Sequence, residues 1–415
     1  MSEARFIVGH TLTALRAMPD ASVDLVLTSP PFLGLRSYLP EDHPDKALEM
    51  GGEGTPGEFI DGLLAVTEEC RRVLAPHGSL CVELGDTYSG TGGNTDNREA
   101  TGAGYDLVPR PSWNGRRERN RTRDSRPGRE STSTAWTPRP EQGGGVGWPL
   151  DKSLCLIPEL YRVALVYGFN PLTGRQTERW RARNVVRWCR PNPPVGALAD
   201  KFRPGTSDMV VACMSRSRYF DLDAVRTEHQ YPDRVNDVVN VRGTTKGSLM
   251  QERSTITNRG NPAGAPPLDW WEISTQPYPG SHYATFPERL CIRPIAAMCP
   301  ERVCTTCGEP SRRITEPTEW NHREHPLERT GIQRGGLGTH GDRVASPTTT
   351  GWSDCGHDAW RPGVVLDPFA GSGTVLAVAF GHGRDSIGID LDARNVDLAR
   401  QRVGMWLTVE GVTYQ

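Results

Sequence analysis

The sequence has no run of 18 apolar residues, and its first ten residues, MSEARFIVGH, lack the apolar stretch of a signal peptide. These absences disfavour a membrane protein and a secreted protein. Cysteine is also sparse, because ten in 415 residues are too few for a scaffold held by disulfides. The pattern indicates a reducing compartment, and we expect a cytoplasmic protein without a membrane partner.

An excess of charge of either sign is missing as well. The 48 basic and 50 acidic residues give a formal net charge of −2, so no overall positive field indicates a polyanionic partner. Lysine is nearly absent, since only four of the basic residues are Lys and the rest are Arg. The planar fork of Arg suits phosphates and guanine edges, but codon bias in a GC-rich genome explains the same count. Both interpretations stay open.

Strand and helix patterns alternate at both ends of the chain. Near the N-terminus, a buried strand at 23–27, an amphipathic helix at 57–75 and a strand at 78–84 form a βαβ unit. Further along we expect a helix at 154–167 and strands at 185–188 and 209–212. Over the last 55 residues we expect strands at 364–366 and 386–389 and helices at 374–380 and 392–405. The fold class is therefore α/β, with a mostly parallel sheet covered by helices on both faces.

Polar segments interrupt these patterns. Between residues 110 and 130 eight Arg stand against three acidic residues, within a Gly-, Ser- and Thr-rich stretch that cannot bury an apolar core. That stretch is either a solvated linker or an arm that becomes ordered on nucleic acid. Residues 226–280 and 311–354 are also polar.

A glycine-rich loop follows the strand at 364–366. The stretch Val364–Thr374 (VVLDPFAGSGT) leads from a strand through Gly371 and Gly373 into a helix, so a ligand can lie against bare backbone. Asp390 comes at the end of the next strand, where an acid can accept hydrogen bonds from ribose hydroxyls. The third glycine of a dinucleotide fingerprint is replaced by Leu376. This favours S-adenosylmethionine over a nicotinamide or flavin cofactor.

A second motif, Thr-Ser-Pro-Pro-Phe, ends the strand at 23–27. The two prolines keep the carbonyl of Pro30 out of the sheet, so that it is free to accept a hydrogen bond. Ser29 and this carbonyl suit the two protons of an exocyclic amine, and Phe32 suits stacking on the ring that carries it. A strand that simply ends in a Pro-Pro turn is the alternative.

Together the two motifs resemble those of the amino-group DNA methyltransferases, in the permuted order of the β group, where the catalytic motif precedes the cofactor motif. Further stretches resemble the same family: residues 58–86, VVRWCRPNPP at 185–194, Tyr219–Phe220–Asp221, and HYATFPERL at 282–290. The resemblance implies a Rossmann-like, circularly permuted fold that binds S-adenosylmethionine.

The resemblance also implies roles for individual residues. Ser29, Pro30, Pro31 and Phe32 would be catalytic and hold a flipped base. The cofactor residues would be Asp367, Pro368, Phe369, Ala370, Gly371, Ser372, Gly373, Thr374, Asp390 and Phe286. The substrate would be double-stranded DNA in a bacterial or phage-infected cell, and a cognate restriction nuclease would act separately.

The residue before Pro-Pro separates two target bases. In the family, Asp or Asn mostly marks adenine N6 enzymes and Ser mostly marks cytosine N4 enzymes, so Ser29 favours cytosine N4. Adenine N6 is the alternative. More remote alternatives are methylation of RNA or of a small amine, and a non-catalytic DNA-binding protein that retains the fold.

Cys304, Cys307, Cys355 and His357 form a third constellation. A Cys-x2-Cys knuckle is the usual half of a tetrahedral zinc site, and the later Cys-x-His pair supplies two more ligands. Cys299 lies near enough to replace one ligand, and two unrelated cysteine clusters are the alternative. We predict a structural zinc ion.

These assignments divide the chain into segments. They are a catalytic half at 1–87, a flexible Arg-rich insertion at 88–150, a core continuation at 151–225, a target recognition region at 226–280, a cofactor half at 281–300 and 360–415, and a zinc-binding insertion at 301–359.

Overall fold

The computed structural model describes residues 2–35, 37–89, 147–193, 200–229, 264–276, 286–316 and 348–411, and the backbone of 238–242 and 253–257. The Arg-rich stretch at 110–130, residues 282–285 of HYATFPERL and most of the polar stretch at 311–354 lie outside the described residues.

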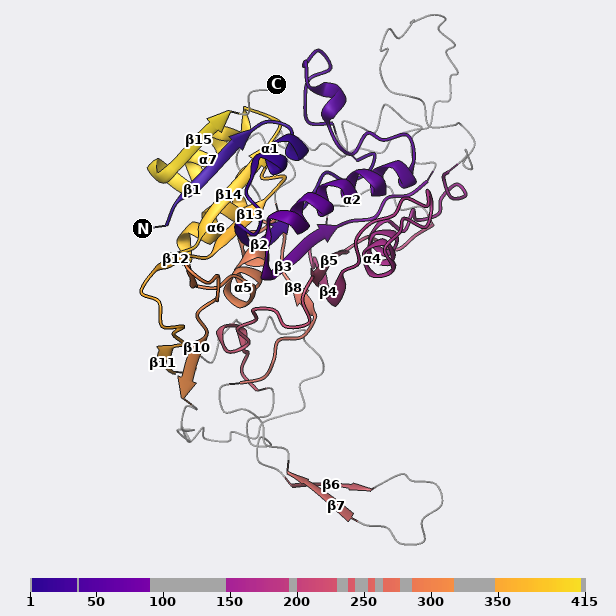
Figure 1. The fold of residues 1–415 in the computed structure, drawn as a ribbon. Coiled ribbons are helices and arrows are strands. Elements are labelled where there is room, and N and C mark those ends of the chain that lie inside the picture. The colour runs from indigo at the N-terminus through magenta and orange to yellow at the C-terminus, as the bar shows by residue number, and fades with distance from the viewer. Residues whose placement is uncertain are drawn as a thin grey trace, which may run out of the picture.

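A nine-stranded sheet forms the centre of the protein, in the order β15-β1-β14-β13-β2-β3-β5-β4-β8 (Figure 1). β5 runs antiparallel to its neighbours β3 and β4, and the other neighbouring pairs are parallel. This confirms the predicted α/β class. The strands are β1 (Ala4–Val8), β2 (Val23–Thr28), β3 (Leu74–Leu84), β4 (Arg181–Cys189), β5 (Thr206–Cys213), β8 (Trp270–Glu272), β13 (Val364–Asp367), β14 (Asp385–Asp390) and β15 (Leu407–Gly411).

Helices cover both faces of this sheet, as the unbroken apolar runs of its central strands require. Val26 of β2 packs into a core with α1, α2 and α4, whereas Leu25 and Leu27 face the opposite side and pack with α5 and α6. The helices are α1 (Thr11–Ala17), α2 (Pro56–Val73), α4 (Ile157–Tyr167), α5 (Glu288–Met298), α6 (Thr374–Gly381) and α7 (Asn395–Val403). In the described residues no helix is both long and apolar enough to cross a bilayer.

Local chemistry sets the ends of these helices. Thr55 caps α2 by accepting a hydrogen bond from the Glu58 amide at 3.2 Å. The helix expected from residue 154 begins at Ile157, because Pro158 fits only the first turn of a helix. The helix expected over 392–405 is shorter and stops before Gly404, whose φ of +83° ends it.

In the part of the chain that the structure describes, three two-stranded ribbons lie outside the main sheet. β6 (Val238–Arg242) pairs with β7 (Arg253–Thr257), β9 (Arg302–Cys304) with β12 (Trp360–Pro362), and β10 (Arg313–Glu316) with β11 (Thr348–Trp352).

The pairing of β2 with β13 brings the two sequence motifs together. Leu25 lies opposite Val365 and Val26 opposite Leu366, in parallel register. Parallel strands end at the same edge of a sheet, so the segments that follow β2 and β13 lie side by side although more than 300 residues separate them. At the far end of the same sheet, β1 lies between β14 and β15. A strand from the N-terminal part of the sequence therefore pairs with two strands from its C-terminal part.

A buried carboxylate links the N-terminal ends of β2 and β13, which are the ends away from the two motifs. Asp24 is fully buried and accepts hydrogen bonds from Arg361 at 2.6 and 3.2 Å and from the Val364 amide at 2.7 Å. The His77 ring lies 3.0 Å away. Burial by itself would raise the pKa of this carboxyl, but hydrogen bonds from His77 and Arg361 outweigh it and lower the pKa. Asp24 is therefore an ionised anchor at the start of the two motif strands.

Candidate active site

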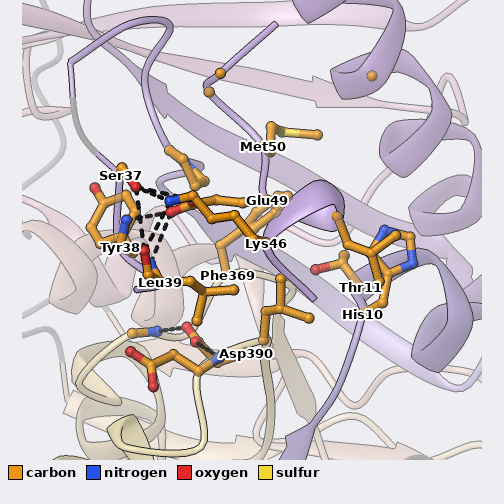
Figure 2. A pocket seen from close by; sticks show the side chains of 18 of the residues that line it. His10, Thr11, Ser37, Tyr38, Leu39, Lys46, Glu49, Met50, Phe369 and Asp390 are labelled. Atoms are coloured by element: carbon orange, nitrogen blue, oxygen red, sulfur yellow. Dashed lines mark hydrogen bonds and ion pairs between the residues drawn. The ribbon is translucent and has the colours of Figure 1, made fainter. Parts of the chain in front are cut away.

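A cavity of about 820 Å³ opens at the carboxyl ends of β2, β13 and β14 (Figure 2). Ser29 and Pro31 line it from the end of β2, and Asp390 from the end of β14. The predicted residues that line it are Ser29, Pro31, Phe286, Phe369, Ala370, Gly371, Ser372, Thr374 and Asp390. The structure thus brings most of the two predicted sets to one cavity.

The backbone conformation of the glycine loop requires glycine at two positions. Gly371 and Gly373 have φ values of +49° and +76°, which side chains rarely tolerate. A Cβ at Gly373 would lie 2.9 Å from the Cβ of Ala399 in α7. The loop can therefore approach a ligand closely and still pack against a helix.

The Asp390 carboxylate accepts hydrogen bonds from the glycine loop and from the segment that follows β14. Its Oδ2 accepts a hydrogen bond from the Gly371 amide at 2.7 Å, and its Oδ1 accepts from the Asp392 amide at 2.8 Å and the Asn395 side chain at 3.0 Å. Burial raises the pKa of this carboxyl, and these hydrogen bonds partly oppose the rise. The Asp390 carboxylate therefore lines the cavity and also fixes the backbone of the glycine loop that forms part of its wall.

Replacing Asp390 with alanine should weaken binding of S-adenosylmethionine by about 1–3 kcal/mol, because a buried acceptor is lost. Calorimetry gives the affinity directly. Asp397→Ala, which removes an exposed acid of α7, is the matched control and should leave the affinity unchanged. Equal affinities for the two variants would exclude Asp390 from the cofactor site.

Three of the predicted cofactor residues do not line the cavity: Asp367, Pro368 and Gly373. The Asp367 carboxyl is buried and accepts a hydrogen bond from Thr28 Oγ1 at 2.6 Å, and the Pro368 carbonyl accepts one from Thr11 at 2.9 Å. Burial raises the pKa of Asp367 to about 7, although the hydrogen bonds from Thr28 and the Phe369 amide oppose the rise. Asp367 links the two motif strands.

This raised pKa predicts a pH dependence of stability. Between about pH 4 and pH 7 the folded chain holds a proton on Asp367 that the unfolded chain has lost, so stability falls as the pH rises. Relative to Asp367→Asn, the wild type should lose up to about 1.4 kcal/mol of unfolding free energy per pH unit in this window. Urea unfolding at a series of pH values measures the difference. Parallel profiles for the two proteins would contradict the assignment.

Ser29 has a buried partner that the sequence interpretation missed. Its hydroxyl donates a hydrogen bond to Glu83 Oε2 at 2.6 Å. Glu83 lies near the end of β3 and is 4% exposed. Burial raises its pKa, while hydrogen bonds from Ser207 and Ser29 and the nearby Arg190 charge oppose the rise. The signal in the sequence was one acid within the apolar run Leu80–Leu84.

The other two residues of the predicted catalytic set, Pro30 and Phe32, do not line the cavity. The Phe32 ring packs on the backbone of Gly85, where an added Cβ would lie 2.6 Å from Cε2. The predicted stacking of Phe32 on a base stays a prediction.

The described residues of a loop over 33–54 form a further part of the wall, and sequence periodicity gave no sign of this loop. Lys46 Nζ contacts Glu49 Oε2 at 2.7 Å and the Leu39 carbonyl at 2.8 Å (Figure 2). Arg394, which follows β14, donates to the Tyr38 carbonyl at 2.8 Å. The loop is thereby tied to the cofactor side of the cavity.

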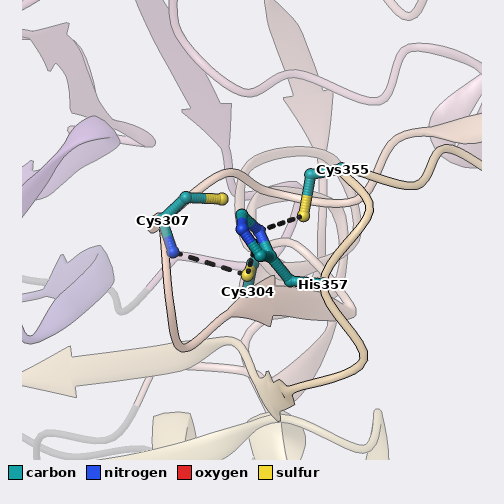
Figure 3. Close-up of side chains that lie close together, drawn as sticks. All are labelled: Cys304, Cys307, Cys355 and His357. Atoms are coloured by element: carbon teal, nitrogen blue, oxygen red, sulfur yellow. Dashed lines mark hydrogen bonds between the residues drawn. The ribbon is translucent and has the colours of Figure 1, made fainter.

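The four predicted metal ligands also come together, away from this cavity. The ligand atoms of Cys304, Cys307, Cys355 and His357 all lie within 4.8 Å of one another (Figure 3). Cys299, considered as a substitute ligand, is instead fully buried at the end of α5.

Comparisons with known proteins identify the family of this chain. A family model described as DNA methylase, N6_N4_Mtase, matches residues 23–303 and 361–401. The type II methyltransferase M.Cfr9I of Citrobacter freundii is 24% identical over 403 residues, covering 97% of this chain and 88% of its own length. M.SmaI of Serratia marcescens is 23% identical over 411 residues, covering 97% and 91%.

Among solved structures, the PvuII DNA methyltransferase, described as cytosine-N4-specific, aligns with a TM-score of 0.47 at 13% identity. The alignment covers 97% of this chain and 86% of that one. The family match spans both motif strands and most of the described fold. The chain therefore belongs to the N6/N4 DNA methylase family and is a DNA methyltransferase.

Proposed function

We propose that the protein transfers a methyl group from S-adenosylmethionine to the N4 amine of a cytosine flipped out of double-stranded DNA. The observation that carries this proposal is the placement of Ser29. Its hydroxyl is bound to the buried Glu83 and borders the cavity that the glycine loop also lines. Ser29 and Pro31 thus line the same cavity as the cofactor motif.

The residues on the cofactor side fit S-adenosylmethionine. Asp390 offers carboxylate oxygens for ribose hydroxyls, and Phe369 and Phe286 give apolar surface. Ser372 is 2% exposed, and its hydroxyl has no hydrogen-bond partner among the described residues, which suits a ligand with polar groups. When bound, the cofactor supplies a methyl group on a positively charged sulfur.

Ser29 and the Pro30 carbonyl would act on the amine. An aryl amine is a poor nucleophile because its lone pair is delocalised into the ring, and hydrogen bonds that draw the nitrogen towards sp³ geometry localise that pair. The Ser29 proton is directed at Glu83, so the lone pairs of Oγ can accept an amine proton. The nitrogen–methyl bond would form as the sulfur–methyl bond breaks and a neutral thioether leaves. One amine proton would then pass to Ser29 Oγ while the Ser29 proton passes to Glu83 Oε2.

Cytosine N4 is proposed as the target because Ser29 stands where the adenine enzymes of the family mostly have Asp or Asn. Adenine N6 remains the second candidate, since an amine on either ring meets the same two acceptors. Base flipping is part of the proposal because the amine lies inside the stacked duplex. We also propose that the protein acts in the cytoplasm of a bacterial or phage-infected cell, with a cognate nuclease as a separate protein.

The recognition region proposed at 226–280 is described in part. β8 adds Trp270 and Trp271 to the edge of the main sheet next to β4. Trp270 is half exposed, whereas Trp271 is buried. The anchor of β8 on the core and the exposed ring of Trp270 support the proposed contact with DNA.

Transfer of a labelled methyl group tests the substrate class. Purified protein is incubated with methyl-labelled S-adenosylmethionine and, in separate reactions, duplex DNA, RNA or free cytidine. We expect label in duplex DNA only. Label in RNA or in free cytidine at a comparable rate would overturn the DNA assignment.

A further inference from the structure

We propose that Cys304, Cys307, Cys355 and His357 bind one zinc ion that is structural and remote from the reaction. This proposal is independent of the base that the enzyme methylates. Three thiolates and one imidazole are a common ligand set for structural zinc, and the four lie within 4.8 Å of one another. The distances within the cluster support the assignment further.

Zinc–sulfur and zinc–nitrogen bonds of about 2.3 and 2.0 Å place sulfur and nitrogen about 3.5 Å apart in a regular tetrahedron. His357 Nδ1 lies 3.6 Å from Cys304 Sγ and 3.4 Å from Cys355 Sγ. The side chains of the cluster converge on a common centre (Figure 3). A disulfide would need two sulfurs about 2 Å apart, and the three cysteines of the cluster form none.

The local backbone forms a knuckle around the first pair of ligands. Cys304 ends β9, and its Sγ accepts a hydrogen bond from the Cys307 amide at 3.5 Å. The Gly308 amide donates to the Cys304 carbonyl at 2.9 Å, and Gly308 has a φ of +73°. The turn thus directs the thiols of Cys304 and Cys307 towards the centre of the cluster.

A β-ribbon brings the second pair of ligands to the first. β12 pairs with β9 so that Trp360 lies opposite Cys304, and the Thr305 amide donates to the Ala359 carbonyl at 2.9 Å. Cys355 and His357 lie directly before this strand. The fold therefore holds the two halves together although about 50 residues separate them.

The position of the cluster indicates what the ion does. Arg361 of β12 follows His357 by four residues and binds Asp24 at the start of β2. The cavity opens at the other ends of β2 and β13. Four protein ligands also leave no coordination position for water or substrate. The ion fixes the ribbon that leads into β13. Its loss therefore lowers the stability of the fold and leaves the chemical step at the cavity unchanged.

Metal analysis of the full chain, purified without chelator, tests the site. We expect about one zinc per chain, with the metal's X-ray absorption showing three sulfur neighbours and one nitrogen neighbour. Cys307→Ser should lower the zinc content several-fold and lower the thermal midpoint. Cys189→Ser, at a half-exposed cysteine outside the cluster, is the matched control and should keep the zinc.

Wild-type protein without zinc would overturn the proposal, as would a coordination shell that lacks sulfur. Full zinc content in Cys307→Ser would also overturn it. The absorption measurement needs no variant, so a failure of Cys307→Ser to fold leaves the test decisive.

Discussion

Ser29→Ala is expected to slow methyl transfer by about a hundredfold or more while the affinity for S-adenosylmethionine stays nearly unchanged. The variant loses the acceptor that draws the amine nitrogen out of conjugation. Pro30 and Pro31 fix the backbone independently of the preceding side chain, so the shape of the cavity should persist. Single-turnover kinetics measures the rate, and calorimetry measures the affinity.

Ser22→Ala provides the matched control for this prediction. Ser22 precedes the same strand at its opposite end, and its hydroxyl donates to the Pro19 carbonyl at 2.7 Å on an exposed surface. Its rate should equal that of the wild type. If Ser29→Ala retained the wild-type rate, Ser29 would have no part in activating the amine.

Asp24→Ala should have the largest effect on stability, lowering the free energy of unfolding by about 3 kcal/mol. The substitution leaves Arg361 without its carboxylate and the buried Val364 amide without an acceptor. The figure lies at the lower end for a buried ion pair because the Arg361 side chain is 28% exposed. Denaturant unfolding measures the change.

Asp20→Ala is a control of the same chemistry at the surface. Asp20 also meets an arginine, Arg72, at 2.6 Å, but its side chain is 78% exposed. A surface pair contributes less than about 1 kcal/mol. Similar losses in the two variants would show that Asp24 does not anchor the motif strands.

The sequence predicted the parts of the site that lie on regular elements. Apolar runs ending in Pro-Pro or in Gly-x-Gly identified β2 and β13, because a buried strand and the loop that follows it leave a local pattern. The four predicted zinc ligands were likewise chosen from their spacing, and the structure brings them together. Their convergence depends on the β9–β12 ribbon, which no local pattern shows.

The features that were missed depend on contacts distant in sequence. Glu83 is an ordinary strand residue until the pairing of β2 with β3 places it beside Ser29. β1 is short, and its position between β14 and β15 depends on pairing with strands from the other end of the sequence. The loop at 33–54 has no periodic pattern, and Arg394 holds it from the other end of the chain.

Mass spectrometry of nucleosides tests the central claim most directly. DNA from cells that express the chain is digested completely and compared with DNA from cells that express Ser29→Ala. N4-methylcytosine should be present in the first sample and absent from the second. N6-methyladenine in place of N4-methylcytosine would contradict the assignment of the target base, and no methylated base in either sample would contradict the proposed activity itself.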